Sequence, residues 1–308
     1  MFYHTTFYSF VKGRQTFSLS SLYEENPICY SYRMIEESKG EVIFMFLVYA
    51  VFFLVSFGAS IIGAICGIGG GVIIKPTLDA FGILDVSSIG FLSGCTVLAM
   101  SCYSVIRSKL SGTSNIQMDT GTPLAIGAAI GGIAGKSMYQ WVASLFADKN
   151  TVGAVQAILL GIVTLGTLIY TIKKDQIKTY HVKNILACLM IGFFLGIMSS
   201  FLGIGGGPIN LVVLYFFFSM TTKVAAQNSL YIILFSQAAS FLMTLFTNTV
   251  PDVSASLLTG MIICGLFGGM AGRGINKKID DHVVDKLFIL LMIVIIGINI
   301  YNTIKYLG

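Results

Sequence analysis

The stretch GAICGIGGGVIIKP, Gly63 to Pro76, interrupts an otherwise apolar segment with three consecutive glycines, a lysine and a proline. These residues are poor material for a membrane helix, because glycine loosens the backbone and proline removes a hydrogen-bond donor. The same GIGGG recurs within SSFLGIGGGP, Ser199 to Pro208. The sequence therefore predicts two broken helices, one at each glycine motif.

The composition predicts an all-α polytopic membrane protein. The chain has 308 residues, of which 55% are hydrophobic and 11% charged, whereas soluble domains carry about 25% charged residues. A run of about 20 apolar residues spans a bilayer. Eight such runs predict about eight transmembrane helices, at 42–66, 87–106, 122–143, 152–172, 184–204, 224–247, 254–272 and 284–304. Shorter apolar pieces follow each GIGGG, at 72–83 and 208–220, and predict broken or re-entrant segments.

An internal repeat organises these segments. Gly67–Gly71 matches Gly203–Gly207 at an offset of 136, which also places Ser93 on Ser229. Further along, GGIAGK at 131–136 matches GGMAGR at 268–273 at an offset of 137. Three landmarks in one order and nearly one spacing indicate two homologous halves. We expect a first membrane repeat at 42–174, a basic cytoplasmic linker at 175–183 and a second repeat at 184–308.

Residues 1–41 are polar and aromatic without a period, and we expect a non-membrane N-terminal segment there. Two interpretations stay open. One is a disordered tail. The other is a mis-assigned start, with Met45 as the native first residue.

Basic loops favour an inverted relation between the halves. Positive residues mark cytoplasmic loops, and they gather near 107–109, 173–183 and 273–278. Eight crossings alone would make the repeats parallel and put the last two of these loops on opposite sides. If the piece after the second GIGGG also crosses, or pairs with the helix before it, each half has five elements and the repeats are inverted.

The glycine breaks predict an anion site. Successive backbone N–H groups at such a break form a concave nest for anions, and a helix that starts just afterwards points its positive end there. Pro208 suits the first position of a new helix. The candidate residues are Gly69, Gly70, Gly71, Gly205, Gly206 and Gly207. Close helix packing is the alternative explanation of these glycines.

Polar side chains near the breaks extend the candidate site. Lys75 lies in the apolar run VIIKPTL, where an ionisable residue is a functional candidate and snorkelling to the interface is the alternative. Other candidates lie on the spans that follow each break, where a hydroxyl bonded to its own helix is the alternative: Ser93, Thr96, Lys223, Asn228 and Ser229.

The segments GIGGGVIIKP, GIGGGP and TKVAAQNS (Thr222 to Ser229) resemble the sulfite exporter TauE/SafE family, also called the toluene sulfonate uptake permease group. The likeness covers about 45–308. It implies a multi-pass protein of the bacterial inner membrane, with two related halves, that moves sulfite, a sulfonate or a related organosulfur anion. Lys75 departs from the pattern, since many members have an apolar residue before this proline.

The leading functional hypothesis is a secondary transporter of a small anion that works by alternating access between the two repeats. An anion channel is the main alternative. A membrane-embedded enzyme would need a nucleophile and base, or a metal cluster, and the spans contain no histidine and almost no acid. A scaffold without transport would not need paired polar breaks.

Scattered cysteines and isolated histidines predict no metal site and no cofactor, and the charge pattern predicts no nucleic-acid partner. No buried carboxylate stands out, which argues against a carboxylate proton relay. The expected partners are the lipid bilayer and a small anionic substrate. Transport direction, coupling ion and oligomeric state stay open.

Overall fold

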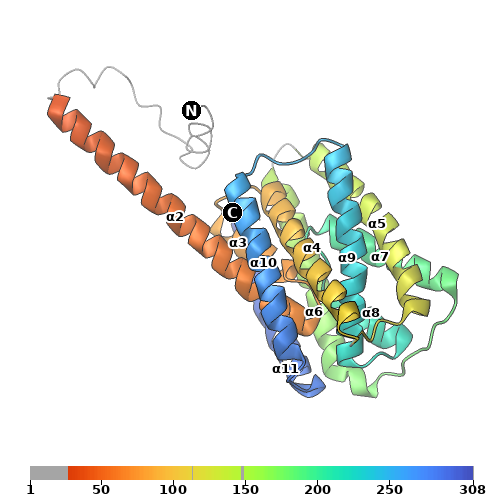
Figure 1. The fold of residues 1–308 in the computed structure, drawn as a ribbon. Coiled ribbons are helices and arrows are strands. Elements are labelled where there is room, and N and C mark those ends of the chain that lie inside the picture. The colour runs from red at the N-terminus through yellow and green to blue at the C-terminus, as the bar shows by residue number, and fades with distance from the viewer. Residues whose placement is uncertain (1–26, 113, 147–148, 308) are drawn as a thin grey trace. The chain divides into compact units, whose positions relative to one another are not determined.

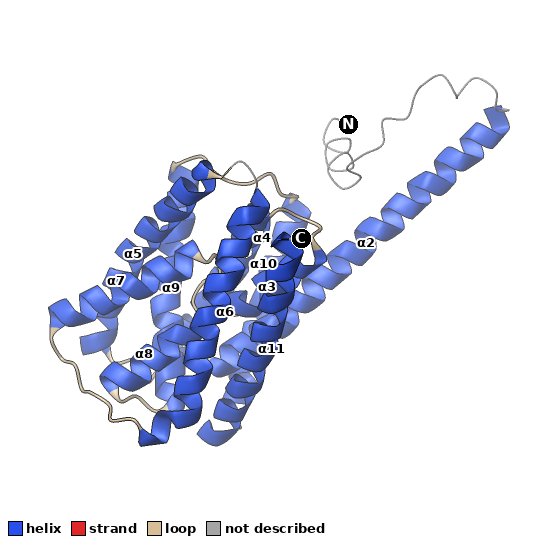
Figure 2. Ribbon diagram, turned by 180° about the vertical axis from the view of Figure 1, so that it is seen from behind, coloured by secondary structure: helices blue, strands red, loops and turns tan. Residues whose placement is uncertain are grey.

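A computed structural model describes residues 27–112, 114–146 and 149–307, and the expectations for residues 1–26 lie outside this part. The described backbone contains helices and no strand (Figures 1 and 2). Residues up to Val51 and residues from Phe52 onward form separate compact units. The helices are α2 (Pro27–Cys66), α3 (Gly71–Phe81), α4 (Val86–Leu110), α5 (Met118–Leu145), α6 (Lys149–Lys173), α7 (Ile185–Phe201), α8 (Pro208–Phe218), α9 (Thr222–Phe246), α10 (Ala255–Asn276) and α11 (Asp281–Leu307), with a short 3₁₀ turn at Lys174–Gln176.

Each predicted apolar segment coincides with a helix, but the count of eight spanning helices is not confirmed. In the described residues six helices are long and apolar enough to cross a membrane: α2, α4, α6, α9, α10 and α11. Helix α7 has 17 residues and is therefore only about 26 Å long, short of a hydrocarbon core of about 30 Å. Helix α5 has 28 residues and is long enough to span, but it is not one of the six. Its glycines and polar side chains lower its mean hydropathy.

One end of the second unit collects the basic loops, and we call it the basic end. The Arg273 guanidinium, at the end of α10, donates to the Ser104 carbonyl of α4 at 2.9 Å. The Asn115 amide, between α4 and α5, donates to Gln227 of α9. Lys174 pairs with Asp285 of α11. The basic end therefore holds the last turns of α4, α6 and α10 and the first turns of α5, α9 and α11.

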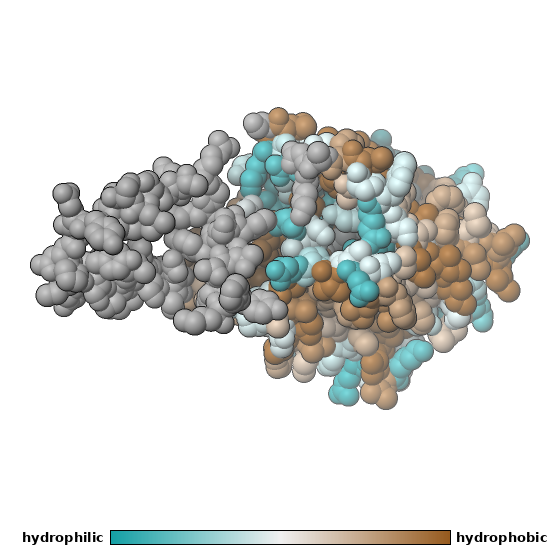
Figure 3. Space-filling view, turned by 90° about the horizontal axis from the view of Figure 1, so that it is seen from above, coloured by the Kyte–Doolittle hydropathy of each residue, from teal (hydrophilic) through white to brown (hydrophobic). Residues whose placement is uncertain are grey.

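Other contacts define the opposite end. Lys305 of α11 donates to the Ala80 carbonyl of α3 at 2.9 Å. Gln140 of α5 donates to Thr249, just after α9, at 2.8 Å. Viewed from this end, hydrophilic residues gather near the middle of the described face and hydrophobic residues cover much of its sides (Figure 3). This distribution suits a bundle that is surrounded by lipid.

Helices of the two halves pack in exchanged pairs. Helix α4 packs against α10 as α9 packs against α5, and α3 packs against α11 as α8 packs against α6. Small residues allow the close approach: a Cβ added to Gly135 of α5 would lie 2.5 Å from the Ile197 carbonyl of α7, and one added to Gly268 of α10 would lie 2.6 Å from the Phe57 carbonyl of α2. Glycines of α5 and α10 thus form close helix–helix contacts.

Candidate functional site

The two glycine motifs break the helices as predicted. Helix α2 ends at Cys66 before α3 begins at Gly71, and α7 ends at Phe201 before α8 begins at Pro208. The turns need backbone angles that favour glycine. The angle φ is +75° at Gly67 and +73° at Gly69, and it is +65° at Gly203 and +69° at Gly205. Equivalent glycines of the two halves thus adopt the same left-handed conformation.

The motifs meet each other in the interior. A Cβ on Gly69 would lie 3.4 Å from the carbonyl oxygen of Gly205. Two buried side chains fill the remaining space, Val97 of α4 and Ile233 of α9, which occupy equivalent repeat positions. The backbone N–H groups of Gly205, Gly206 and Gly207 donate no hydrogen bond within the described residues. These donors lie at the positive N-terminal end of α8, but in this conformation apolar side chains cover them.

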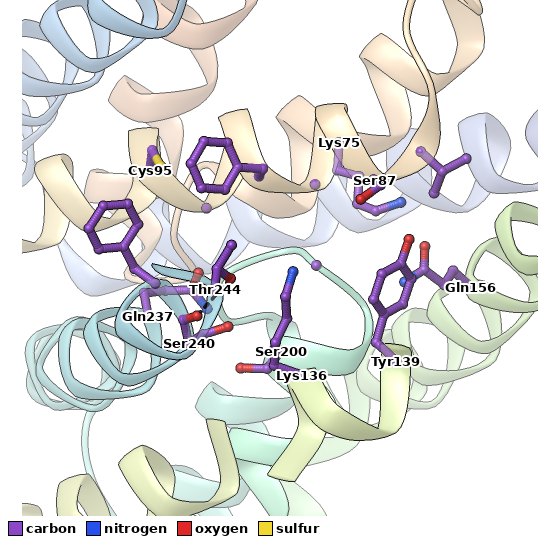
Figure 4. A pocket seen from close by; sticks show the side chains of 16 residues that line it. Lys75, Ser87, Cys95, Lys136, Tyr139, Gln156, Ser200, Gln237, Ser240 and Thr244 are labelled. Carbon is purple, nitrogen blue, oxygen red and sulfur yellow. Dashed lines mark hydrogen bonds between the residues drawn. The ribbon is translucent and has the colours of Figure 1, made fainter. Parts of the chain in front are cut away.

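A cavity of about 50 Å³ lies beside the second motif, toward the opposite end. Both halves contribute to its wall, through α3, α4, α5 and α6 on one side and α7 and α9 on the other. Figure 4 shows the polar side chains that converge on it: Lys75, Ser87, Lys136, Tyr139, Gln156, Ser200, Gln237, Ser240 and Thr244. The cavity therefore has both polar and apolar walls, and it lies between the repeats.

Lys75 of α3 reaches the cavity wall through a gap left by glycines. A Cβ on Gly203 would lie 3.2 Å from the Lys75 Cε atom, and one on Gly90 would lie 3.9 Å from it. The ammonium group pairs with Asp79, one turn further along α3, at 3.0 Å. Only 4% of the Lys75 side chain and 7% of the Asp79 side chain are exposed. Asp79 lies on α3, which continues to Phe81, within the segment predicted at 72–83.

Lys136 of α5 supplies a second positive charge. Its ammonium nitrogen lies 5.5 Å from the centre of the Tyr139 ring, on the same helix. No carboxylate of the described residues lies within ion-pair distance of it. In Figure 4 the Lys136 side chain extends from its helix into the cavity. Two lysines and one aspartate thus leave an excess of positive charge, which favours an anion.

Polar atoms without partners also face this space. The Ser200 hydroxyl and the Gln156 side-chain oxygen are buried and make no hydrogen bond in the described structure, while the Gln156 amide nitrogen donates to the Phe201 carbonyl. A buried polar atom left unpaired costs about 1–3 kcal/mol. Water or a ligand with oxygen atoms would relieve this cost.

The remaining predicted residues do not line the cavity. Thr96 donates to the Leu92 carbonyl of its own helix at 2.8 Å. Asn228 accepts from the Gln117 amide at 3.1 Å, so it holds the loop between α4 and α5 at the basic end. Lys223 lies in the first turn of α9, also at the basic end. Ser93 and Ser229 are fully buried, and their hydroxyls have no partner among the described residues.

Sequence reasoning missed Lys136, Gln156, Ser200 and Asp79. Lys136 had a signal, since it ends GGIAGK, where the second half has Arg273. Among the described residues no group of three or more histidine, cysteine or acidic side chains could hold a metal ion.

A multi-pass helical bundle whose two halves enclose a charged central cavity has the architecture of a membrane transporter. The family described as sulfite exporter TauE/SafE matches residues 52–300. The chain belongs to this family of membrane transporters, as the resemblance had predicted, and it is a multi-pass membrane protein. The match begins at the residue where the second compact unit begins.

The chain is also similar to the probable membrane transporter protein YunE of Bacillus subtilis (strain 168). The two are 23% identical over 266 residues, which cover 77% of this chain and 92% of the relative. No solved structure matches the chain.

Proposed function

We propose that the protein is a secondary carrier of a small sulfur oxyanion, such as sulfite or a short organosulfonate, and that the anion binds in the cavity. The observation that carries this proposal is Lys136, a cation at the wall of an interior cavity with no carboxylate partner among the described residues. Lys75 adds a second ammonium group that an anion can reach. The description of the family as sulfite exporters supports sulfur oxyanions as the class.

The size of the cavity supports a small anion. About 10–15 Å³ of such space is enough for one water molecule, so about 50 Å³ accommodates a few water-sized groups. A sulfur atom with three oxygens has this size. Phe91 and Phe241 also line the cavity, with ring centres 6.2 Å apart. They offer an apolar wall to the carbon atom of a short sulfonate.

An inverted repeat is the second part of the proposal. Contacts at the basic end involve the last turn of α4 and the first turn of α9, although these helices occupy equivalent positions in the two halves. The positive residues gathered there support a cytoplasmic location of the basic end. The cavity would then face the other side of the membrane.

The comparison of the two ends supports the proposed alternating access. Gly90 and Gly203 border the cavity. Their repeat equivalents at the basic end are Ala226 and Gly67, and there Ala226 packs directly onto Gly67. This pattern supports a carrier that is open at Gly90 and Gly203 and closed at Ala226 and Gly67. Movement of one half against the other would close the first pair and open the second.

Uptake of radiolabelled sulfite into proteoliposomes tests the proposal. A charge-assisted hydrogen bond contributes about 1.5–3 kcal/mol, so Lys136→Met should raise KM about tenfold or more or abolish uptake. Lys223→Met is the matched control, because Lys223 lies outside the cavity, and it should leave KM unchanged. Uptake should saturate and show counterflow. Unaltered uptake by Lys136→Met would refute the site, and flux that stays linear with concentration would indicate a channel.

A further inference from the structure

The ion pair between Lys75 and Asp79 has a feature that the transport proposal does not use. Oxygen Oδ2 of Asp79 accepts from the Lys75 ammonium at 3.0 Å. Oxygen Oδ1 is buried and has no hydrogen-bond partner. Lys75 borders the cavity, whereas Asp79 lies behind it and does not. The pair therefore presents its cation to the cavity and keeps its carboxylate in the interior.

Few other charges face the pair. Lys305 of α11 donates to the Asp79 backbone carbonyl at 3.3 Å and to that of Ala80, so its ammonium group is held at the end of α3. The remaining titratable neighbours are Tyr306 from α11, Tyr139 and Lys136 from α5, and Asp85, which caps α4. Apart from Lys75, no neighbour forms an ion pair with the Asp79 carboxylate in the described structure.

We infer that Asp79 is a proton-binding site and that its protonation is coupled to binding of the substrate anion, so that the carrier moves an anion together with a proton. This inference rests on the transport function proposed above. An anion in the cavity competes with Asp79 for the Lys75 ammonium group. When Lys75 turns to the anion, Asp79 becomes a buried carboxylate without a partner, which is strongly unfavourable. Protonation removes this cost.

The proton balance of the step is simple. The Asp79 carboxylate takes up one proton from solvent and becomes a neutral carboxylic acid. Lys75 keeps its charge and changes its partner from carboxylate to anion. When the anion leaves on the other side of the membrane, Lys75 returns to Asp79 and the proton is released to that same side. One proton thus accompanies each anion. The net charge moved in each cycle is therefore the charge of the anion plus one.

Linkage gives the expected magnitude. If one proton binds with each anion, the apparent Kd of the anion rises about tenfold for each pH unit above the pKa of the empty site. Sulfite itself gains or loses a proton as the pH changes. The dependence of the apparent Kd on pH must therefore be compared between variants. Two anions are compared: sulfite, and methanesulfonate, whose charge does not change with pH. Each is first measured on wild-type protein in proteoliposomes that contain a pH-sensitive dye.

Three variants separate the contributions. Asp79→Asn removes the proton site and should lower the pH slope of apparent affinity by one proton, with anion counterflow retained. Lys75→Met/Asp79→Asn removes both charges, which avoids an unpaired buried lysine, and should likewise lose the slope. Asp85→Asn is the matched control, because asparagine also caps helices, and it should keep the wild-type slope.

The outcomes distinguish the two proposals. Proton entry with the anion in wild-type liposomes, lost in both Asp79 variants, is the expected result. Anion movement with the same pH slope in wild type and in both Asp79 variants would overturn the proton coupling and leave the transport function intact. Absence of sulfite and methanesulfonate movement by the wild type would overturn the transport function itself.

Discussion

The contact between the two glycine motifs can be tested with Gly205→Ala. Two separate effects oppose an added methyl group. The backbone of Gly205 has φ of +69°, and the new Cβ would lie 2.9 Å from Val97 Cγ1 and 3.0 Å from Val97 Cβ. Ordinary van der Waals contact begins near 3.4 Å, so Val97 would have to move by several tenths of an ångström inside a packed interior.

The magnitudes of the two effects add. A left-handed conformation costs an alanine roughly 1–2 kcal/mol, and overpacking of a filled core costs about 1–3 kcal/mol. We therefore expect Gly205→Ala to lower the free energy of unfolding by about 2–5 kcal/mol. At roughly 2–4 °C for each kcal/mol, the apparent Tm should fall by about 4–20 °C.

Two matched glycines separate the effects. Gly112 has φ of +63° and nothing within 4 Å of an added Cβ, so Gly112→Ala should show the backbone strain alone. Gly166 on α6 has neither a positive φ nor a close neighbour, and alanine there should be neutral or slightly stabilising. The double variant Gly205→Ala/Val97→Ala provides space for the methyl group and should be less destabilised than the sum of the single variants.

The assay is the temperature at which the detergent-purified protein loses its monodisperse elution peak. The expected order of Tm is Gly166→Ala highest, Gly112→Ala intermediate and Gly205→Ala lowest. If Gly205→Ala were as stable as Gly112→Ala, or if the double variant were strictly additive, the packing of the second motif against Val97 would be refuted.

Three further variants test other contacts. Asn228→Ala should lower the free energy of unfolding by about 1–3 kcal/mol, because it frees the loop between α4 and α5, and should leave the KM for sulfite unchanged; a raised KM would return Asn228 to the site. Thr96→Val removes only a bond to its own helix, so sulfite uptake should stay near the wild-type rate, and a large loss would contradict this. Arg273→Met removes a bond to Ser104 and should speed maleimide labelling of Cys102 near the basic end; an unchanged rate would show that this contact does not close it.

Much of the fold could be predicted because membrane helices leave strong signals. Apolar runs located every helix from α2 to α11, and GIGGG located both breaks. The count of eight spanning helices is not confirmed at α5 and α7. At α7 the hydropathy continues through Phe201 and Leu202, whereas the helix stops at the glycine turn. Hydropathy records burial in lipid, and it does not record where a backbone changes direction.

The candidate site was harder to predict for a physical reason. A cavity depends on which faces of distant helices meet, and local sequence patterns such as hydropathy do not record this. Lys75 was identified because a lysine in an apolar run is conspicuous. Asp79 was not identified as a candidate, although it lies one turn from Lys75 on α3. Ser200 and Gln156 carry no charge, and nothing in their local sequence marks them.

Comparison of the two repeats shows that the Lys75–Asp79 ion pair belongs to the first half alone. At the offset of 136, Lys75 corresponds to Leu211 and Asp79 to Tyr215, and both counterparts are buried. The second half therefore keeps the helix break but replaces the ion pair with apolar and aromatic packing. Many carriers are built from two related halves that move against each other around a shared site. In the proposed carrier, one anion site and one proton site are enough, provided that both lie where the halves meet, and the wall between α3 and the second motif is such a place.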